Sequence, residues 1–150
     1  LSESKYIKKE TEDNLNINNP QNADVLWGLA NKHLYDSLAV QTNKWFPLNA
    51  HKYNTENIDN FFNEEARNRE GTKWEFENSR YKITSYFKGA IYAFDKIERK
   101  YFVLWVPSNL YDWTQKIEFY NNHSIILFKI GNENRPLYKI DLQKMIIMKI

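Results

Sequence analysis

Histidines come first in a search for chemistry, because imidazole is both a common metal ligand and a proton carrier near neutral pH. The chain has three of them, His33, His51 and His123. No two stand three or four residues apart and no His-Glu-x-x-His run occurs, so a linear zinc motif is absent from the sequence. His123 follows a turn signal and could act as a general base, but a solvent-facing turn residue is the simpler interpretation. His33 falls on the inner stripe of an expected helix, where a structural role is favoured.

Other linear signatures of catalysis are also missing from the sequence. The chain has no cysteine, which excludes cysteine nucleophiles, thiolate metal sites and disulfides. Neither a Walker A loop, a dinucleotide-binding fingerprint nor a Gly-x-Ser-x-Gly elbow occurs among its four glycines. The carboxylate pairs Glu64-Glu65 and Glu75/Glu77 fall on polar faces of expected elements, where solvated surface is the favoured interpretation. The sequence therefore predicts no cofactor and no bound metal ion.

The composition indicates one folded domain. The chain has 150 residues, and 16% of them are aromatic, which is too many for a disordered chain. Residues 1–19 are charged and rich in Asn, and we expect them to form a mobile arm ahead of a single α+β domain over residues 20–150. No apolar run is long enough to cross a membrane, and the lack of cysteine favours the cytoplasm.

Helical spacing dominates the first half of the domain. Asn19 can cap a helix that starts at Pro20. The apolar stripe of this helix would comprise Leu26, Leu29, Ala30, His33, Leu34 and Leu38. Residues 43–53, with aromatics beside a proline, are expected to form a loop that covers the edge of the core. A second helix is predicted over residues 55–69.

Strand-like alternation takes over at Thr72. The expected strands cover residues 72–77, 81–87, 90–94, 101–106, 124–130, 137–140 and 145–150. The strands over 90–94 and 101–106 would form a hairpin joined by the charged residues 95–100. The near-continuous apolar run 101–106 is typical of a central strand covered on both faces. Residues 142–150 could alternatively form a terminal helix.

The segment around residues 109–121 is ambiguous between helix and strand. Leu110, Trp113, Ile117 and Tyr120 fall three or four residues apart, and this spacing favours a helix. In the competing interpretation, residues 115–120 form a strand in which Ile117 and Phe119 share a face. The predicted fold is therefore α+β, with N-terminal helices and a mixed or antiparallel sheet of about 5–7 strands that a helix over 109–121 interrupts.

Three short runs resemble the core of the PD-(D/E)xK restriction-endonuclease-like superfamily. They are Ile91-Tyr92-Ala93-Phe94-Asp95, Tyr101-Phe102-Val103-Leu104-Trp105-Val106-Pro107 and Trp113-Thr114-Gln115-Lys116. In that family one strand carries Asp, the next carries Glu-x-Lys, and a following helix often contains Gln. The resemblance covers about 40 residues and implies a nuclease-like sheet that binds Mg²⁺ where the motif is intact.

The motif is not intact in this chain. Its Glu-x-Lys positions fall on Trp105 and Pro107, which can neither bind Mg²⁺ nor activate water. Glu98 and Lys100 do spell Glu-x-Lys close to Asp95, but all three lie in one expected hairpin turn. The catalytic candidates are thus Asp95, Glu98, Lys100 and His123, and we expect the family's active site to be absent.

The positive charge of the chain is concentrated in its second half. Residues 1–75 carry 9 basic and 12 acidic residues, whereas residues 76–150 carry 12 and 7. A basic half can attract an anionic partner. Contacts to a nucleic acid would come from Arg80, Lys82, Lys88, Lys96, Arg99 and Lys100, with stacking from Tyr111 and Trp113. Ordinary surface variation and core packing of the aromatics are the favoured interpretations.

Elimination leaves two hypotheses on function. The first is a non-catalytic interaction domain that binds a protein partner, such as an inhibitor or immunity-type protein of a bacterium or phage. The alternative is a nucleic-acid-binding protein or divergent nuclease that uses the basic half. A protein partner is expected over nucleic acid, because the small size, the Asn-rich composition and the lack of catalytic motifs suit an inhibitor or immunity-type protein.

Overall fold

The computed structural model describes residues 19–54, 72–86, 90–108, 114–120, 125–130 and 137–150. Nearly all of the expected N-terminal arm, 1–19, and the whole helix expected over 55–69 lie outside these residues. Within them, a 3-10 turn η1 (Pro20–Asn22) leads into two short helices, α2 (Ala23–Ala30) and α3 (Leu34–Val40). The helices precede all of the described strands, as the α+β prediction requires.

Ten strands follow the helices among the described residues. They are β1 (Trp45–Pro47), β2 (Lys52–Asn54), β3 (Thr72–Glu77), β4 (Tyr81–Tyr86), β5 (Ile91–Asp95), β6 (Lys100–Trp105), β7 (Thr114–Tyr120), β8 (Ile125–Ile130), β9 (Leu137–Asp141) and β10 (Ile146–Lys149). The strands predicted from alternation after Thr72 are confirmed, with ends that shift by at most one residue.

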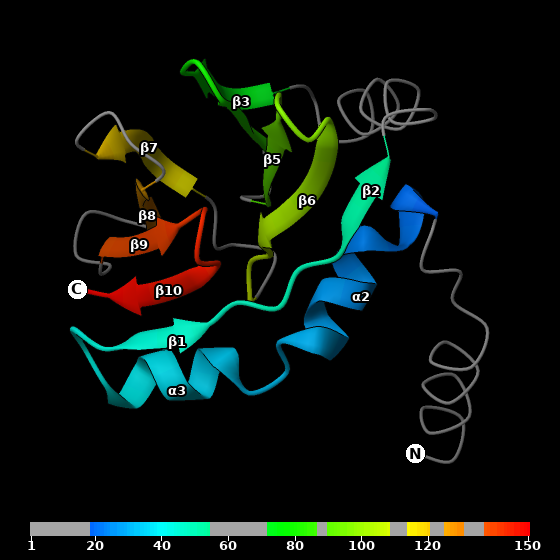
Figure 1. Ribbon diagram of the computed structural model, residues 1–150. Coiled ribbons are helices and arrows are strands. Elements are labelled where there is room, and N and C mark those ends of the chain that lie inside the picture. Colours follow the sequence, from blue (N-terminus) through cyan, green and yellow to red (C-terminus); the bar gives the residue numbers. More distant parts are fainter. Residues whose placement is uncertain (1–18, 55–71, 87–89, 109–113, 121–124, 131–136) are drawn as a thin grey trace, which may run out of the picture.

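The strands form two antiparallel sheets of five. Sheet A has the order β1-β10-β9-β8-β7, and sheet B has the order β2-β6-β5-β4-β3. The chain from β1 to β2 passes along both sheets, because β1 pairs with β10 and β2 pairs with β6 (Figure 1). Of the two sheet types expected, the antiparallel one is correct, but the strands divide between two sheets instead of forming a single sheet of 5–7.

The helix expected over residues 109–121 is wrong for residues 114–120, which form β7. This strand pairs with β8, with Ile117 opposite Phe128 and Phe119 opposite Ile126. Ile117 is buried, whereas Tyr120 is 39% exposed. Pairing and burial on one face therefore outweigh the helical spacing, which a strand with mixed faces can produce by chance.

Three further expectations fail, in the middle of the chain and near its C-terminal end. A helix between the expected strands over 101–106 and 124–130 would make those strands parallel neighbours in one sheet, whereas β6 and β8 lie in different sheets. The alternative of a terminal helix over 142–150 is also wrong, because residues 146–149 pair with β9 as strand β10. The segment 43–53, expected to be a loop, contributes β1 and β2 instead.

The expected single N-terminal helix is broken after Ala30. Asn31 is buried, and its side-chain Nδ2 donates to the Trp27 carbonyl at 3.1 Å and to the Asn49 carbonyl at 2.6 Å. Asn49 N–H donates back to Asn31 Oδ1 at 2.9 Å. This side chain competes with the helix for backbone groups and stops it. His33 consequently lies exposed at the start of α3, not on the inner stripe.

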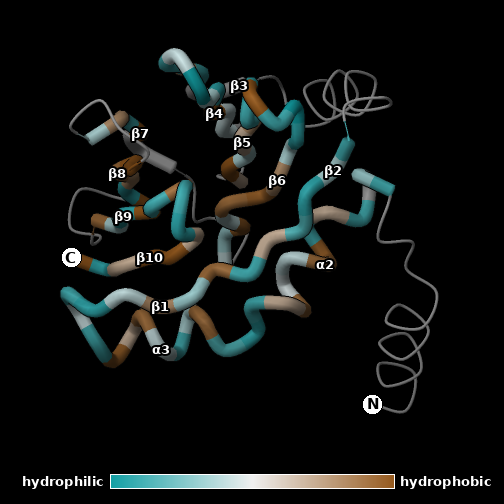
Figure 2. The backbone as a smooth tube through the Cα atoms, viewed as in Figure 1, coloured by the Kyte–Doolittle hydropathy of each residue, from teal (hydrophilic) through white to brown (hydrophobic). Residues whose placement is uncertain are grey.

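The core joins both sheets to the helices around Trp105. Its ring lies 5.8 Å from the Trp27 ring, 5.2 Å from Tyr35, 5.4 Å from Phe128 and 5.0 Å from Tyr138, measured between centroids. All side chains from Phe102 to Trp105 are buried, which confirms the prediction of a central strand. Figure 2 shows the corresponding hydrophobic stretches on β6 and β8. Among the described residues, no helix combines the length and apolar character that a membrane crossing demands.

Candidate functional site

Two adjoining turns at one end of sheet B bring several predicted site residues together. We call residues 78–80 and 96–99 the turn face. Lys96 connects the two turns, because its backbone N–H donates to the Arg80 carbonyl at 2.7 Å and its Nζ donates to the Asn78 carbonyl at 2.9 Å. The Asn78 side chain closes its own turn by accepting from the N–H groups of Arg80 and Tyr81 at 2.9 and 2.8 Å.

Asp95 is the buried anchor of the second turn. Its Oδ1 accepts from the N–H groups of Ile97 and Glu98 at 3.0 and 3.2 Å, and its carbonyl accepts from Arg99 N–H at 2.7 Å. Its Oδ2 accepts from the Arg80 guanidinium at 3.1 Å. Every oxygen of Asp95 is therefore hydrogen-bonded, and together these bonds hold the turn.

The surroundings of Asp95 keep its carboxylate charged. Burial alone would raise the pKa of Asp95, but the hydrogen bonds from Arg80, Glu98 and Ile97 and the charge of Arg80 outweigh burial and lower it. The pKa of Arg80 is raised, chiefly by its hydrogen bond to Asp95. The pair thus stays ionised and joined at neutral pH.

The other candidates near this turn are also held by partners on neighbouring elements. Glu98 lies 2.7 Å from Lys52 Nζ of β2, and Lys100 Nζ donates to Asn54 Oδ1 at 2.6 Å. Glu98 and Lys100 therefore tie the turn to β2 and do not converge with Asp95 on a shared point. No three His, Asp or Glu side chains in the described part of the chain could hold a metal ion.

The basic residues proposed to contact phosphate are largely opposed by carboxylates. Lys82 pairs with Glu75 at 3.2 Å, and Lys96 pairs with Glu77. Both carboxylates come from β3. Lys82 lies on the neighbouring strand β4, whereas Lys96 lies in the turn after β5. His123, Lys88, Tyr111 and Trp113 lie outside the described residues.

Sheet A contains a turn of the same construction. Asp141 ends β9, and its Oδ1 accepts from the N–H groups of Gln143 and Lys144 at 3.0 and 3.1 Å. Met145, four residues after Asp141, has a φ of 51°, as Arg99 has a φ of 56° four residues after Asp95. The turn after Asp95 and the turn after Asp141 both border a polar cavity of about 480 Å³, which Arg80, Asp95 and Gln143 help to line.

The two turns differ at the exposed position two residues after the aspartate. The turn in sheet A has Gln143 there, whereas the turn face has Ile97, which is 71% exposed. A polar residue therefore satisfies this turn geometry, and nothing in the fold requires an apolar side chain at position 97. This feature was not predicted, although the shared Asp spacing of the two hairpins is visible in the sequence.

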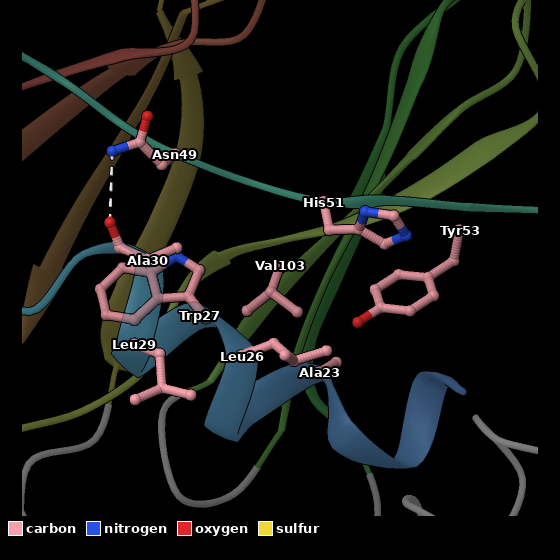
Figure 3. Close-up of a pocket in the computed structure, with 9 residues that line it drawn as sticks. All are labelled: Ala23, Leu26, Trp27, Leu29, Ala30, Asn49, His51, Tyr53 and Val103. Carbon is pink, nitrogen blue, oxygen red and sulfur yellow. Dashed lines mark hydrogen bonds between the residues drawn. The ribbon is translucent and has the colours of Figure 1, made fainter. Parts of the chain in front are cut away.

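A second candidate site is an apolar pocket between α2 and sheet B. The cavity measures about 330 Å³ (Figure 3). Its lining comprises Ala23, Leu26, Trp27, Leu29 and Ala30 of α2, Asn49 and His51 before β2, Tyr53 of β2 and Val103 of β6. The pocket was not predicted from the sequence, because its walls come from separate elements that share no motif.

No family model, curated protein or solved structure matches this chain. Function therefore rests on the geometry of the turn face and the apolar pocket.

Proposed function

We propose that the chain is a non-catalytic interaction domain that binds a protein partner through the turn face. The observation that carries the proposal is Ile97, a large apolar side chain held exposed on a turn whose backbone is fixed. In the matching turn of sheet A the same position is polar. Ile97 thus gives the turn face an apolar contact that the matching turn of sheet A lacks.

The rigidity of the turn supports a binding role. Asp95, Arg80 and Lys96 fix the backbone on both sides of Ile97 through hydrogen bonds of 2.7–3.2 Å. A surface already held in its bound shape loses little conformational entropy on association, so more of the contact energy becomes affinity. A hairpin turn without such hydrogen bonds would lose conformational entropy when it became ordered on binding.

The chemical pattern around Ile97 also suits a protein partner. Lys96 and Glu98 flank it in sequence, and each forms an ion pair, so a polar rim surrounds one apolar anchor. Protein interfaces commonly have an apolar centre within a polar rim. An inhibitor or immunity-type protein needs only such a surface, because it acts by occupying its partner and performs no reaction.

The alternative, a nucleic-acid binder or nuclease, has less support. Arg80, Lys82 and Lys96 each face a carboxylate within ion-pair distance, so phosphate groups would meet neutralised pairs. Asp95 and Glu98 are committed to Arg80 and Lys52. A nuclease would need these carboxylates free to bind a metal ion.

A comparison of two matched variants tests the proposal. Ile97→Gln places on the turn face the residue type that Gln143 supplies in the sheet A turn. Val40→Gln is the control, because it makes the same kind of change at a 78% exposed residue at the end of α3. Each immobilised protein is exposed to a lysate of the native host, and bound proteins are quantified by mass spectrometry. We expect a protein that wild type and Val40→Gln retain and that Ile97→Gln loses. Identical sets of bound proteins for all three would contradict the proposal.

A further inference from the structure

The pocket beside α2 is open to solvent on one side, where the exposed residues Ala30 and Asn49 line it. This cavity of about 330 Å³ falls within the range of small-molecule pockets, which begins near ~300 Å³. It lies between Leu26 and Leu29 of α2 on one side and Val103 of β6 on the other (Figure 3).

The uncharged side chains that line the pocket favour an uncharged ligand. The exposed surface of the pocket comes mostly from apolar side chains, and none of the nine lining residues is Asp, Glu, Lys or Arg. Burial and the charge of Lys100 lower the pKa of His51, the one titratable base in the wall, so its imidazole is neutral at pH 7. A charged ligand would lose part of its hydration there without meeting an opposite charge among the lining residues.

Two hydrogen-bond donors in the wall lack a partner among the described residues. They are the hydroxyl of Tyr53, which is 4% exposed, and the indole N–H of Trp27, which is 3% exposed. Figure 3 shows the Tyr53 ring extending from β2 toward Ala23 and Leu26. Burial and the nearby Asp24 raise the pKa of Tyr53 to about 12, so the hydroxyl keeps its proton. Buried donors of this kind normally have an acceptor.

We propose that this pocket binds a small uncharged ligand of two fused rings that carries one hydrogen-bond-accepting oxygen. The size follows from the volume, because an apolar cavity of roughly 150 Å³ accommodates one benzene ring. The oxygen would accept from the Tyr53 hydroxyl, while the rings pack between Leu29 and Val103. This site is separate from the turn face, and its occupancy does not depend on a protein partner.

The bicyclic ketone 1-tetralone is a suitable probe, with methyl-resolved NMR of the full chain as the readout. We expect saturable binding with a Kd on the order of 100 µM, as fits a ligand of this size. The largest shifts should fall on the methyl groups of Leu26, Leu29 and Val103. Absence of saturable binding, or shifts concentrated elsewhere in the protein, would overturn the proposal.

Two substitutions on α2 locate the site. Ala30 lines the pocket from an exposed position, so Ala30→Phe should cover its mouth and weaken tetralone binding at least tenfold. Val25 is 47% exposed on the same helix and does not line the pocket, so Val25→Phe should leave the Kd within about twofold. Equal effects of the two changes would contradict the assignment. Far-ultraviolet circular dichroism confirms that both variants are folded.

Tyr53→Phe tests the hydrogen bond alone, since it removes a hydroxyl that has no partner among the described residues. Tetralone binding should weaken by about threefold to tenfold, the usual worth of one hydrogen bond. Binding of tetralin, which has the same rings without the oxygen, should stay unchanged. If Tyr53→Phe weakens both molecules equally or neither, the hydroxyl does not recognise the oxygen. Tight binding of the charged 2-naphthoate would overturn the assignment of an uncharged ligand.

Discussion

The Arg80 guanidinium lies 3.1 Å from Oδ2 of Asp95, while Oδ1 of the same carboxylate accepts the N–H groups of the turn that follows. One buried side chain thus fixes both the strand end and the turn. Asp95 is only 3% exposed, so its charge depends on Arg80 for compensation. The rigidity of the turn face follows from this pair.

Asp95→Asn should destabilise the fold by about 2–4 kcal/mol. The amide can still accept the turn N–H bonds, but Arg80 loses its buried counter-charge. Urea denaturation of the two proteins measures the difference. Asp141→Asn is the matched control, because Asp141 makes the same turn bonds and has no ion pair among the described contacts. We expect it to cost less than about 1 kcal/mol, and an equal cost for both would show that the ion pair adds nothing.

The contribution of Asp95 should also depend on pH. Its pKa in the folded chain lies below the ordinary value of 3.8. A lowered folded-state pKa adds stability above the unfolded-state pKa and loses it as pH falls through the folded-state value. The stability gap between wild type and Asp95→Asn should therefore stay constant from about pH 7 to 5 and narrow below 3.8. If the stability gap widens as the pH falls, folding raises the pKa of Asp95 instead of lowering it.

Trp105→Ala should be the most damaging core substitution among the tryptophans described. The ring contacts Trp27, Phe128 and Tyr138 and thereby joins α2 to both sheets. Loss of such a ring costs about 3–5 kcal/mol. Trp45→Ala, at a half-buried residue of β1, should cost about 1–2 kcal/mol. Thermal and urea unfolding would distinguish the two, and a smaller loss for Trp105 would contradict its central place.

A gel-shift assay should detect no binding of duplex DNA or RNA at ~50 mM salt. The expectation rests on the ion pairs that Lys82 and Lys96 make with Glu75 and Glu77. Retardation that weakens steeply as salt rises would support the nucleic-acid alternative instead. Loss of that retardation in an Arg80→Ala or Lys96→Ala variant would then place the contact on the turn face.

Strand prediction succeeded where burial alternates cleanly along the chain. Tyr81, Ile83 and Ser85 are buried while Lys82 and Thr84 are only half-buried, and this period of two is legible in the sequence. The near-continuous apolar run 101–106 indicated a different kind of strand, one that is covered on both faces. Local pattern is enough in such segments, because each residue's environment depends on which face it occupies.

Prediction failed where a distant partner decides the local structure. Ile117 fits either a helical stripe or a strand face, and only its pairing with Phe128 selects the strand. Asn31 breaks the first helix through bonds to Asn49, which is 18 residues away. The roles of the candidate site residues also depend on partners that are distant in the sequence. Asp95, Glu98 and Lys100 were found from their spacing, but their structural roles follow from Arg80, Lys52 and Asn54.

The most direct test of the turn face as a binding surface is a titration of the captured partner, once purified, against wild type, Ile97→Gln and Val40→Gln by isothermal calorimetry. Truncation of a central apolar anchor costs about 2 kcal/mol or more in binding, so Ile97→Gln should raise the Kd by about 30-fold or more. Val40→Gln should leave the Kd within about twofold. Equal Kd values for wild type and Ile97→Gln would contradict the account.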